Sequence, residues 1–165
     1  MTEQVSGTIY RDAPYKEGEV AAGASVTPGM GIEKRGPNPD GDPLVQPVST
    51  VEPTGAQSRF AREQRVPPRG EDGSMLDQVY DADNHIEFRV YRRGDIVENA
   101  LLAAGGDLAT TSEATVTVGD PLAFNDDGSL KLATVAGAEE AQAREDVDNS
   151  GAAAGDRARI SVEVL

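Results

Sequence analysis

His85 is the single histidine of the chain, and the chain contains no cysteine. A Ser-His-Asp triad would have to be built around this one side chain, and no nucleophile elbow lies near it. The lack of cysteine excludes disulfides, thiolate catalysis and cysteine-based zinc sites. We therefore interpret His85 as a polar residue at the mouth of a strand, and we predict no catalytic residues and no enzymatic activity.

Carboxylates gather at Asp120, at Asp126-Asp127 and in the stretch Asp81-Ala82-Asp83-Asn84. Calcium takes about six to eight oxygen ligands, and paired carboxylates serve acid and base catalysis. Asp126-Asp127-Gly128 lacks the alternate spacing of a calcium loop, and the chain has no tryptophan to stack on a sugar. We interpret these carboxylates as turn residues and predict neither metal nor cofactor. A calcium-dependent glycan-binding module or an acidic hydrolase is the alternative.

Two short motifs carry no chemistry in our interpretation. Gly29-Met30-Gly31 with Gly36 is superficially similar to a dinucleotide-binding loop, but the third glycine is misplaced and no helix is predicted after it. Arg93-Gly94-Asp95 matches a cell-adhesion tripeptide, but its residues already serve a turn before a strand.

A run of arginines is the best candidate for a binding surface. Arg59, Arg62, Arg65 and Arg69 are opposed locally by Glu63 alone. Arginine forks bind carboxylates in a bidentate way and are enriched at interfaces, whereas exposed ion pairs contribute little. The arginines are either solvated and paired with nearby carboxylates, or they hold an acidic neighbour.

The chain is strongly acidic, with 29 acidic and 15 basic residues and a formal charge of −14. Such a surface repels itself in dilute buffer, and concentrated salt screens this repulsion within a few ångströms. We therefore predict a high-salt environment. The same field argues against direct nucleic-acid binding, because that affinity depends on basic footprints. No apolar stretch approaches the length that crosses a bilayer, so we expect no membrane contact and no export signal.

The composition and the positions of turn residues predict an all-β fold of one domain. Valine outnumbers leucine by 16 to 9, and β-branched residues pack well on a pleated surface. Three Gly-Asp pairs, at 94, 119 and 155, each precede a short apolar stretch, which is turn chemistry before strands. Ile86, Phe88 and Val90 alternate with polar residues, as Ile160, Val162 and Val164 do at the end of the chain.

Further segments are assigned as follows. Asn125-Asp126-Asp127-Gly128 predicts a hairpin turn between strands at 122–124 and 130–133. Residues 138–146 look helical by propensity. Residues 1–35 are predicted to form N-terminal strands or an arm. Residues 36–57 are dense in proline and glycine and are predicted to form a solvated loop or arm. Residues 58–165 form the remaining module.

That module resembles the head decoration, or capsid cement, proteins of tailed viruses. The resemblance lies in the order and the residues of these segments: 59–63, 80–83, 92–105, 118–120, 126–131, 145–150 and 158–165. It implies a compact β-barrel or β-tulip on the outside of an icosahedral head, commonly a trimer, that bridges major capsid subunits. It also implies a strand at Gln142 to Val147, which we prefer to the helix.

The resulting hypothesis is a non-enzymatic decoration protein that stabilises contacts between major capsid subunits. With the acidic surface, it points to a virus of a halophilic archaeon. The residues that we expect to contact partners are apolar anchors in the N-terminal region, Val5, Ile9, Tyr10 and Tyr15, and the four arginines 59, 62, 65 and 69. A spike or turret component that recognises the host is a further alternative.

Overall fold

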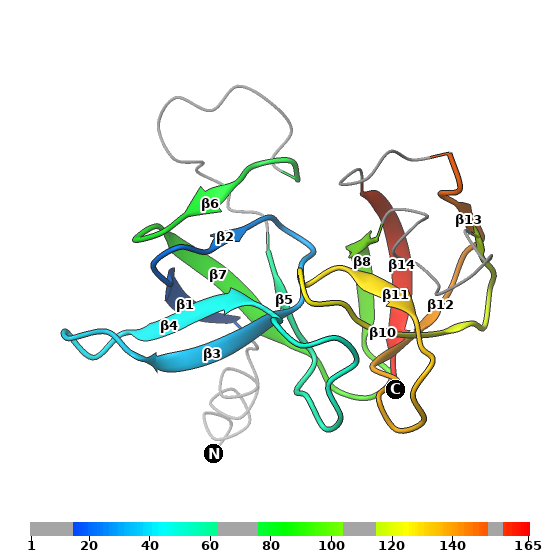
Figure 1. Cartoon of the computed structure of the whole chain (residues 1–165), viewed down its shortest axis with the longest axis horizontal. Helices are drawn as coiled ribbons and strands as arrows, with labels where there is room; N and C mark the ends of the chain where they lie inside the picture. Colours follow the sequence, from blue (N-terminus) through cyan, green and yellow to red (C-terminus); the bar gives the residue numbers. More distant parts are fainter. Residues whose placement is uncertain (1–14, 63–75, 104–114, 152–156) are drawn as a thin grey trace, which may run out of the picture.

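The computed structural model describes residues 15–62, 76–103, 115–151 and 157–165, which form two lobes side by side along the longest axis (Figure 1). No helix occurs in these ranges, so the predicted all-β fold with a small barrel is confirmed. The strands, in chain order, are β1 (Tyr15–Val20), β2 (Ser25–Val26), β3 (Ile32–Pro37), β4 (Pro43–Pro47), β5 (Arg59–Ala61), β6 (Tyr80–Asp81), β7 (His85–Val90), β8 (Ile96–Leu102), β9 (Thr115–Val116), β10 (Pro121–Phe124), β11 (Leu130–Leu132), β12 (Ala141–Ala143), β13 (Val147–Asp148) and β14 (Ala158–Val164).

The first lobe is a curled five-stranded sheet in the order β3-β4-β1-β7-β5. Its two outer strands approach each other, because Gly31 beside β3 forms an antiparallel bridge with Phe60 of β5. The amide of Ala61 also donates to the carbonyl of Met30 at 2.9 Å. The short β2–β6 ribbon adds to a core made of Val20, Val26, Ile32, Val45, Ala61, Tyr80, Ile86 and Phe88.

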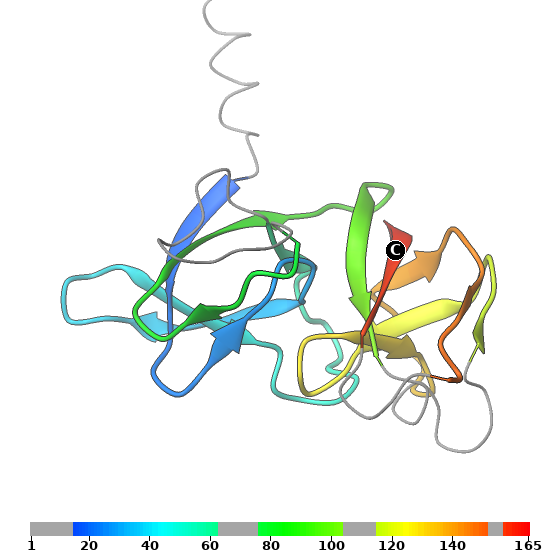
Figure 2. The ribbon, with the colours of Figure 1, turned by 90° about the horizontal axis from the view of Figure 1, so that it is seen from above.

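The second lobe is a closed barrel of β10, β11, β8, β14 and β12, with the separate ribbon β13–β9 beside it. Closure leaves the barrel without free strand edges. Most pairs are antiparallel, but β11 runs parallel to β8, as β1 does to β4 in the first lobe. Figure 2 shows the two lobes from above. All pairings of β5, β6 and β7 lie within the first lobe. The strands of the barrel therefore begin with β8.

Strong local patterns predicted the correct strands. Ile86 and Phe88 are fully buried in β7, and Ile160, Val162 and Val164 are buried in β14. The hairpin around Asp126-Asp127 joins β10 to β11, with Leu122 opposite Leu132 and Phe124 opposite Leu130. Gly128 takes the positive φ of 77° that the turn requires.

The helical propensity of residues 138–146 was misleading, and the preferred strand is only partly correct. The chain there forms the short strands β12 and β13 with a turn between them. Ala141 and Ala143 of β12 are buried opposite Val164 and Val162 of β14. A helix would not give this two-residue alternation against a strand, so long-range pairing overrides the local preference.

The Pro-rich segment 36–57 is more ordered and more buried than a solvated arm. Its residues Pro43–Pro47 form β4, which lies between β3 and β1 in the sheet. The two prolines lie at the ends of the strand, where a missing amide donor costs least. Val48 and Glu52, after β4, are buried at 3% and 7% exposure, so this part packs onto the barrel.

Candidate partner interface

Most of the predicted anchor residues lie outside the described ranges. Val5, Ile9, Tyr10, Arg65 and Arg69 are among them, so the structure does not place these side chains. Tyr15 is the first residue of β1, and its backbone lies opposite Arg89 of β7. The described part of the predicted interface is therefore Arg59 and Arg62.

These two arginines do not lie on one surface. Side chains alternate along a strand, so Arg59 shares a face with Ala61, which is buried in the first-lobe core. Arg62 lies on the outer face, where its Nη1 is 3.6 Å from Oε2 of Glu87. Each of the two described arginines therefore has its own surroundings.

Arg59 has an unsatisfied donor. Its Nη2 donates to Oε1 of Gln57, whereas its Nε is buried without a hydrogen-bond partner. Burial lowers the pKa of the Arg59 guanidinium from its ordinary value. A buried donor without an acceptor is costly.

Two lysines that the sequence analysis did not select belong to strands of the same sheet as Arg59. Lys16 of β1 is directly opposite Phe88 of β7, and Nζ of Lys34 is 5.8 Å from the centroid of the Phe88 ring. Arg59 is opposite Val90, which packs on the same core. We call Lys16, Lys34 and Arg59 the basic end of the first lobe. Within the described residues, no carboxylate forms an ion pair with any of the three.

The signal for this cluster is weak in the sequence. The alternation of β1 places Lys16 on the same face as Gly18 and Val20, which are buried. Bringing Lys34 beside it requires the order β3-β4-β1-β7-β5, which no local pattern specifies. Sequence spacing alone instead favoured the four arginines.

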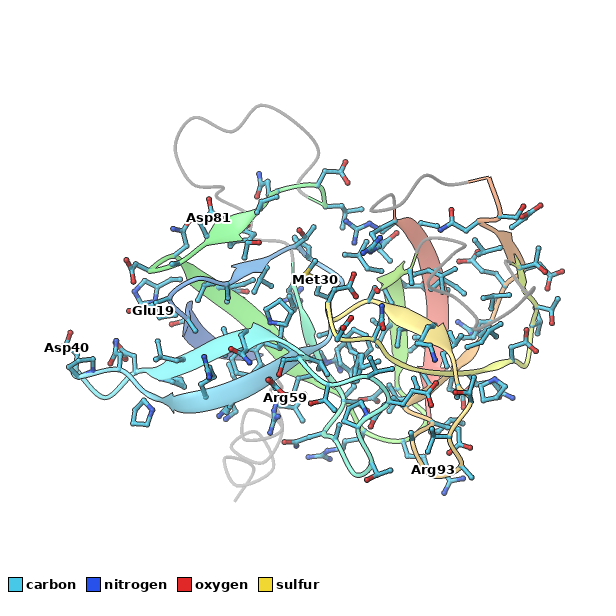
Figure 3. All side chains as sticks on the ribbon, viewed as in Figure 1. Glu19, Met30, Asp40, Arg59, Asp81 and Arg93 are labelled. Carbon is cyan, nitrogen blue, oxygen red and sulfur yellow. The ribbon has the colours of Figure 1, made fainter. Side chains whose placement is uncertain are left out.

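The β3–β4 hairpin projects from the first lobe, and Asp40 lies at its end (Figure 3). We call the exposed Asp40 and Asp42 the acidic tip. Asn38 fixes its shape, since its Oδ1 accepts from the amide of Asp42 at 2.8 Å and its Nδ2 donates to Glu19 at 3.1 Å. The amide of Gly41 donates to the carbonyl of Asn38 at 3.0 Å. The tip is thus an ordered element that buries none of its own side chains in the core.

The two lobes meet closely at the glycines of the Gly29-Met30-Gly31 motif. A Cβ at Gly31 would lie 2.1 Å from the Phe124 ring, and one at Gly29 would lie 2.3 Å from the carbonyl oxygen of Asn99. The amide of Gly31 donates to the carbonyl of Gly128 at 2.6 Å. Phe60 of the first lobe packs against Phe124, with ring centroids 5.3 Å apart. These glycines allow the two lobes to approach each other.

A buried ion pair ties residue 52 to the barrel. Nζ of Lys131 donates to Oε1 of Glu52, and the hydroxyl and amide of Thr134 donate to the same carboxylate at 2.8 and 2.9 Å. Burial alone would raise the pKa of Glu52, but the hydrogen bonds from Lys131 and Thr134 outweigh it and lower that pKa. The carboxylate is therefore charged and structural.

Glu140 behaves in the opposite way. Burial raises the pKa of Glu140, and one hydrogen bond from the Ser58 hydroxyl, at 2.7 Å, offsets this only in part. A carboxyl with a raised pKa is a common feature of acid and base catalysts. Here the carboxyl contacts Ser58, which lies in the loop before β5. Glu140 is 6% exposed.

The acidic turns have structural partners. Asp127 accepts from the amide and hydroxyl of Ser129 and from Arg157; burial alone would raise the pKa of Asp127, but these bonds lower it. Asp120 accepts from the amide of Thr117 at 2.8 Å. His85 is exposed at the start of β7. Among the described residues, no three carboxylate or histidine side chains are grouped as metal ligands.

An open hollow lies where the lobes adjoin. It is lined by β2 and β4 residues and by the β10–β11 turn, including Met30, Gln46, Ser49 and Asp126. Two of its lining side chains are already bonded, since Nε2 of Gln46 and the hydroxyl of Ser49 both donate to Oε1 of Glu33. The hollow is a shallow surface feature with no converging reactive groups in the described part of the chain.

Comparison with known proteins finds a structural likeness and no match in sequence. No family model and no curated protein sequence matches the chain. A solved structure, described as the head fiber gp8.5 N base in bacteriophage phi29, superposes with a TM-score of 0.52. The match covers 92% of this chain and 94% of that chain at 10% sequence identity.

This likeness shows the fold of the chain, since identity at this level carries no residue-by-residue correspondence. It extends over both lobes, because the matched share exceeds what either lobe contains. Within the described residues no helix is long and apolar enough to span a bilayer.

Proposed function

We propose that the chain is a non-enzymatic protein of a viral head, which binds the outer surface of the icosahedral shell and stabilises contacts between major capsid subunits. The observation that carries the proposal is the likeness of both lobes to the base of a phage head fibre. The resemblance of residues 59–165 to head decoration proteins supports it independently. In this proposal the partners are the major capsid protein and further copies of the chain, arranged as a trimer.

The physical mechanism is linkage between binding and assembly. A protein that binds the assembled shell and not its separated subunits stabilises the shell by about 2.7 kcal/mol per site at a hundredfold excess over Kd. A rigid binder loses little conformational entropy on docking. The close glycine contacts and the buried Glu52–Lys131 pair support such rigidity between the lobes.

The acidic surface supports the further proposal that the host lives in high salt. A charge of −14 on 165 residues is tolerated best where the Debye length is short. A virus of a halophilic archaeon is the source that we propose on this ground.

Binding to empty heads of the same virus tests the function. Purified chain should co-sediment with heads that lack it and should raise the temperature at which those heads dissociate. A variant that begins at residue 15 tests the N-terminal anchors Val5, Ile9 and Tyr10; truncation must stop there because β1 is an inner strand of the sheet. We expect this variant to fold with an unchanged far-ultraviolet spectrum and to lose head binding.

Two results would count against the proposal. Absence of co-sedimentation by the full chain at saturating concentration contradicts head binding. Full binding by the truncated chain contradicts the anchor assignment and leaves the described lobes as the binding part.

A spike component that recognises the host is a second candidate, and the same structural likeness favours it because that structure is the base of a head fibre. Imaging of decorated heads distinguishes the two. Copies at threefold positions between capsid subunits support decoration, whereas copies confined to fivefold vertices support a spike.

A further inference from the structure

The basic end and the acidic tip of the first lobe are complementary in charge. In a chain of net charge −14, the basic end gathers Lys16, Lys34 and Arg59 without a described acidic partner. The acidic tip presents Asp40 and Asp42, both exposed, on a projecting hairpin (Figure 3). The tip is held by hydrogen bonds of its own before any contact is made.

From these surfaces we infer that the acidic tip of one copy docks on the basic end of a second copy. The Arg59 side chain is half-buried, and a carboxylate of Asp40 or Asp42 would pair with the exposed part of its guanidinium. The two lysine ammonium groups would receive the other carboxylate oxygens. The contact joins different patches on the two copies, so it repeats head to tail and closes into a ring where the rotation allows.

The structure favours a second copy as the occupant over an unrelated acidic segment. The end of the hairpin, residues 38–42, is held by the Asn38 hydrogen bonds although none of its side chains enters either core. Preorganisation of this kind lowers the entropic cost of docking. The inference deepens the proposed self-association, and its test uses no heads, so its failure is distinct from a failure of head binding.

Charge reversal on each side, and on both together, is the first test. The tip variant is Asp40→Lys with Asp42→Lys, and the basic-end variant is Lys34→Glu with Arg59→Glu. Sedimentation velocity over a concentration series, at about 0.15 M salt where the Debye length is about 8 Å, measures association. We expect the wild-type chain to associate, and we expect each reversal to weaken association by about tenfold or more.

The combined four-residue variant keeps the net charge of the wild type and should restore association. Glu98→Lys with Glu163→Lys, on exposed positions of the barrel, has the same change in net charge as the tip variant and should leave association intact. A wild-type chain that stays monomeric overturns the inference. Failure of the combined variant to restore association, or an equal loss in the control, overturns it as well.

The absence of cysteine allows a second, direct test. Asp40→Cys and Lys34→Cys are made as separate single variants and mixed under mild oxidation. A disulfide requires Cα atoms about 4.4–6.8 Å apart, so it forms between the two variants only where tip and basic end meet. We expect a cross-linked heterodimer from this mixture and none from Asp40→Cys mixed with Glu98→Cys. Equal cross-linking in both mixtures contradicts the inference.

Discussion

At the scale of single residues, two buried glutamates with opposite pKa shifts report on how the segment between β4 and β5 is held against the barrel. Glu52 is stabilised as an anion by Lys131 and Thr134, whereas Glu140 is disfavoured as an anion by burial and has one donor, Ser58. Both contacts join residues about 80 positions apart in the chain, at separations of 79 and 82. The two side chains should therefore respond to pH in opposite directions.

Replacing Glu52 with glutamine should lower the free energy of unfolding by about 3 kcal/mol at pH 7, because Lys131 is then buried without a counter-charge. The folded-state pKa of Glu52 is below its ordinary value of 4.5. Its contribution is therefore present above that pH and is lost as the pH falls through the lower folded value. Urea unfolding at pH 7 and below pH 4 measures this, and an equal loss at both values would contradict it.

Replacing Glu140 with glutamine should have the opposite effect. The folded-state pKa is raised above 4.5, so the wild-type contribution is fully present below that value and is lost as the pH rises through the folded value. Glutamine keeps an oxygen for the Ser58 hydroxyl and removes the charge. We expect a higher melting temperature than the wild type at pH 7 and little difference near pH 4. A lower melting temperature at pH 7 would show that the charged form is stabilising.

At the scale of elements, the connection between β2 and β3 determines how the lobes fit together. Gly29 and Gly31 are buried there, and Met30 lies between them. The segment bonds to β5 within the first lobe and to Gly128 and Leu101 of the second lobe. It therefore closes the curled sheet and joins it to the barrel at the same place.

Gly31→Ala should destabilise the protein by about 2–3 kcal/mol, because its Cβ would overlap the buried ring of Phe124. Gly36→Ala is the matched control, since it lies in the same strand region and a Cβ there meets no atom within 4 Å. Chemical unfolding of both variants measures the difference.

A partial rescue would identify the cause. Adding Phe124→Leu to Gly31→Ala should recover part of the loss, and the interaction energy of the double-mutant cycle should be favourable. Additive losses in this cycle would mean that the ring is not what the new methyl group meets.

At the scale of the whole molecule, the main features are the net charge and the position of the acidic side chains at the surface. The chain has a net charge of −14 on a fold that lacks disulfides, with most of its acidic side chains outside the two cores. Repulsion among them opposes compaction and extends over about 10 Å at 0.1 M salt. The basic end is a local departure from this acidic surface.

The melting temperature should therefore rise as sodium chloride is increased from about 0.05 M to the molar range, where the Debye length falls to about 3 Å. Differential scanning fluorimetry with an added dye measures this change. Potassium chloride at equal ionic strength should act similarly if screening is the cause. A melting temperature that falls or stays constant over this range would remove the physical basis for a high-salt host.

The sequence by itself determined the elements that depend on neighbouring residues. Strand alternation in β7 and β14 and the Asp-Gly turn before β11 act over a few residues, because side-chain direction and backbone angles are local properties. The same reasoning gave the all-β class and the acidic, cysteine-free surface. It failed for residues 138–146, where the preference for helix was local and the pairing of β12 with β14 was not.

Only the tertiary structure decided what depends on distant partners. Pro43–Pro47 became an inner strand because β1 and β3 lie on either side of it. Gly31 became a contact point because Phe124, 93 residues later, is buried against it. Lys16, Lys34 and Arg59 form one basic end because three strands meet around Phe88. Register and strand order are set by the packing of the whole core, which local spacing does not encode.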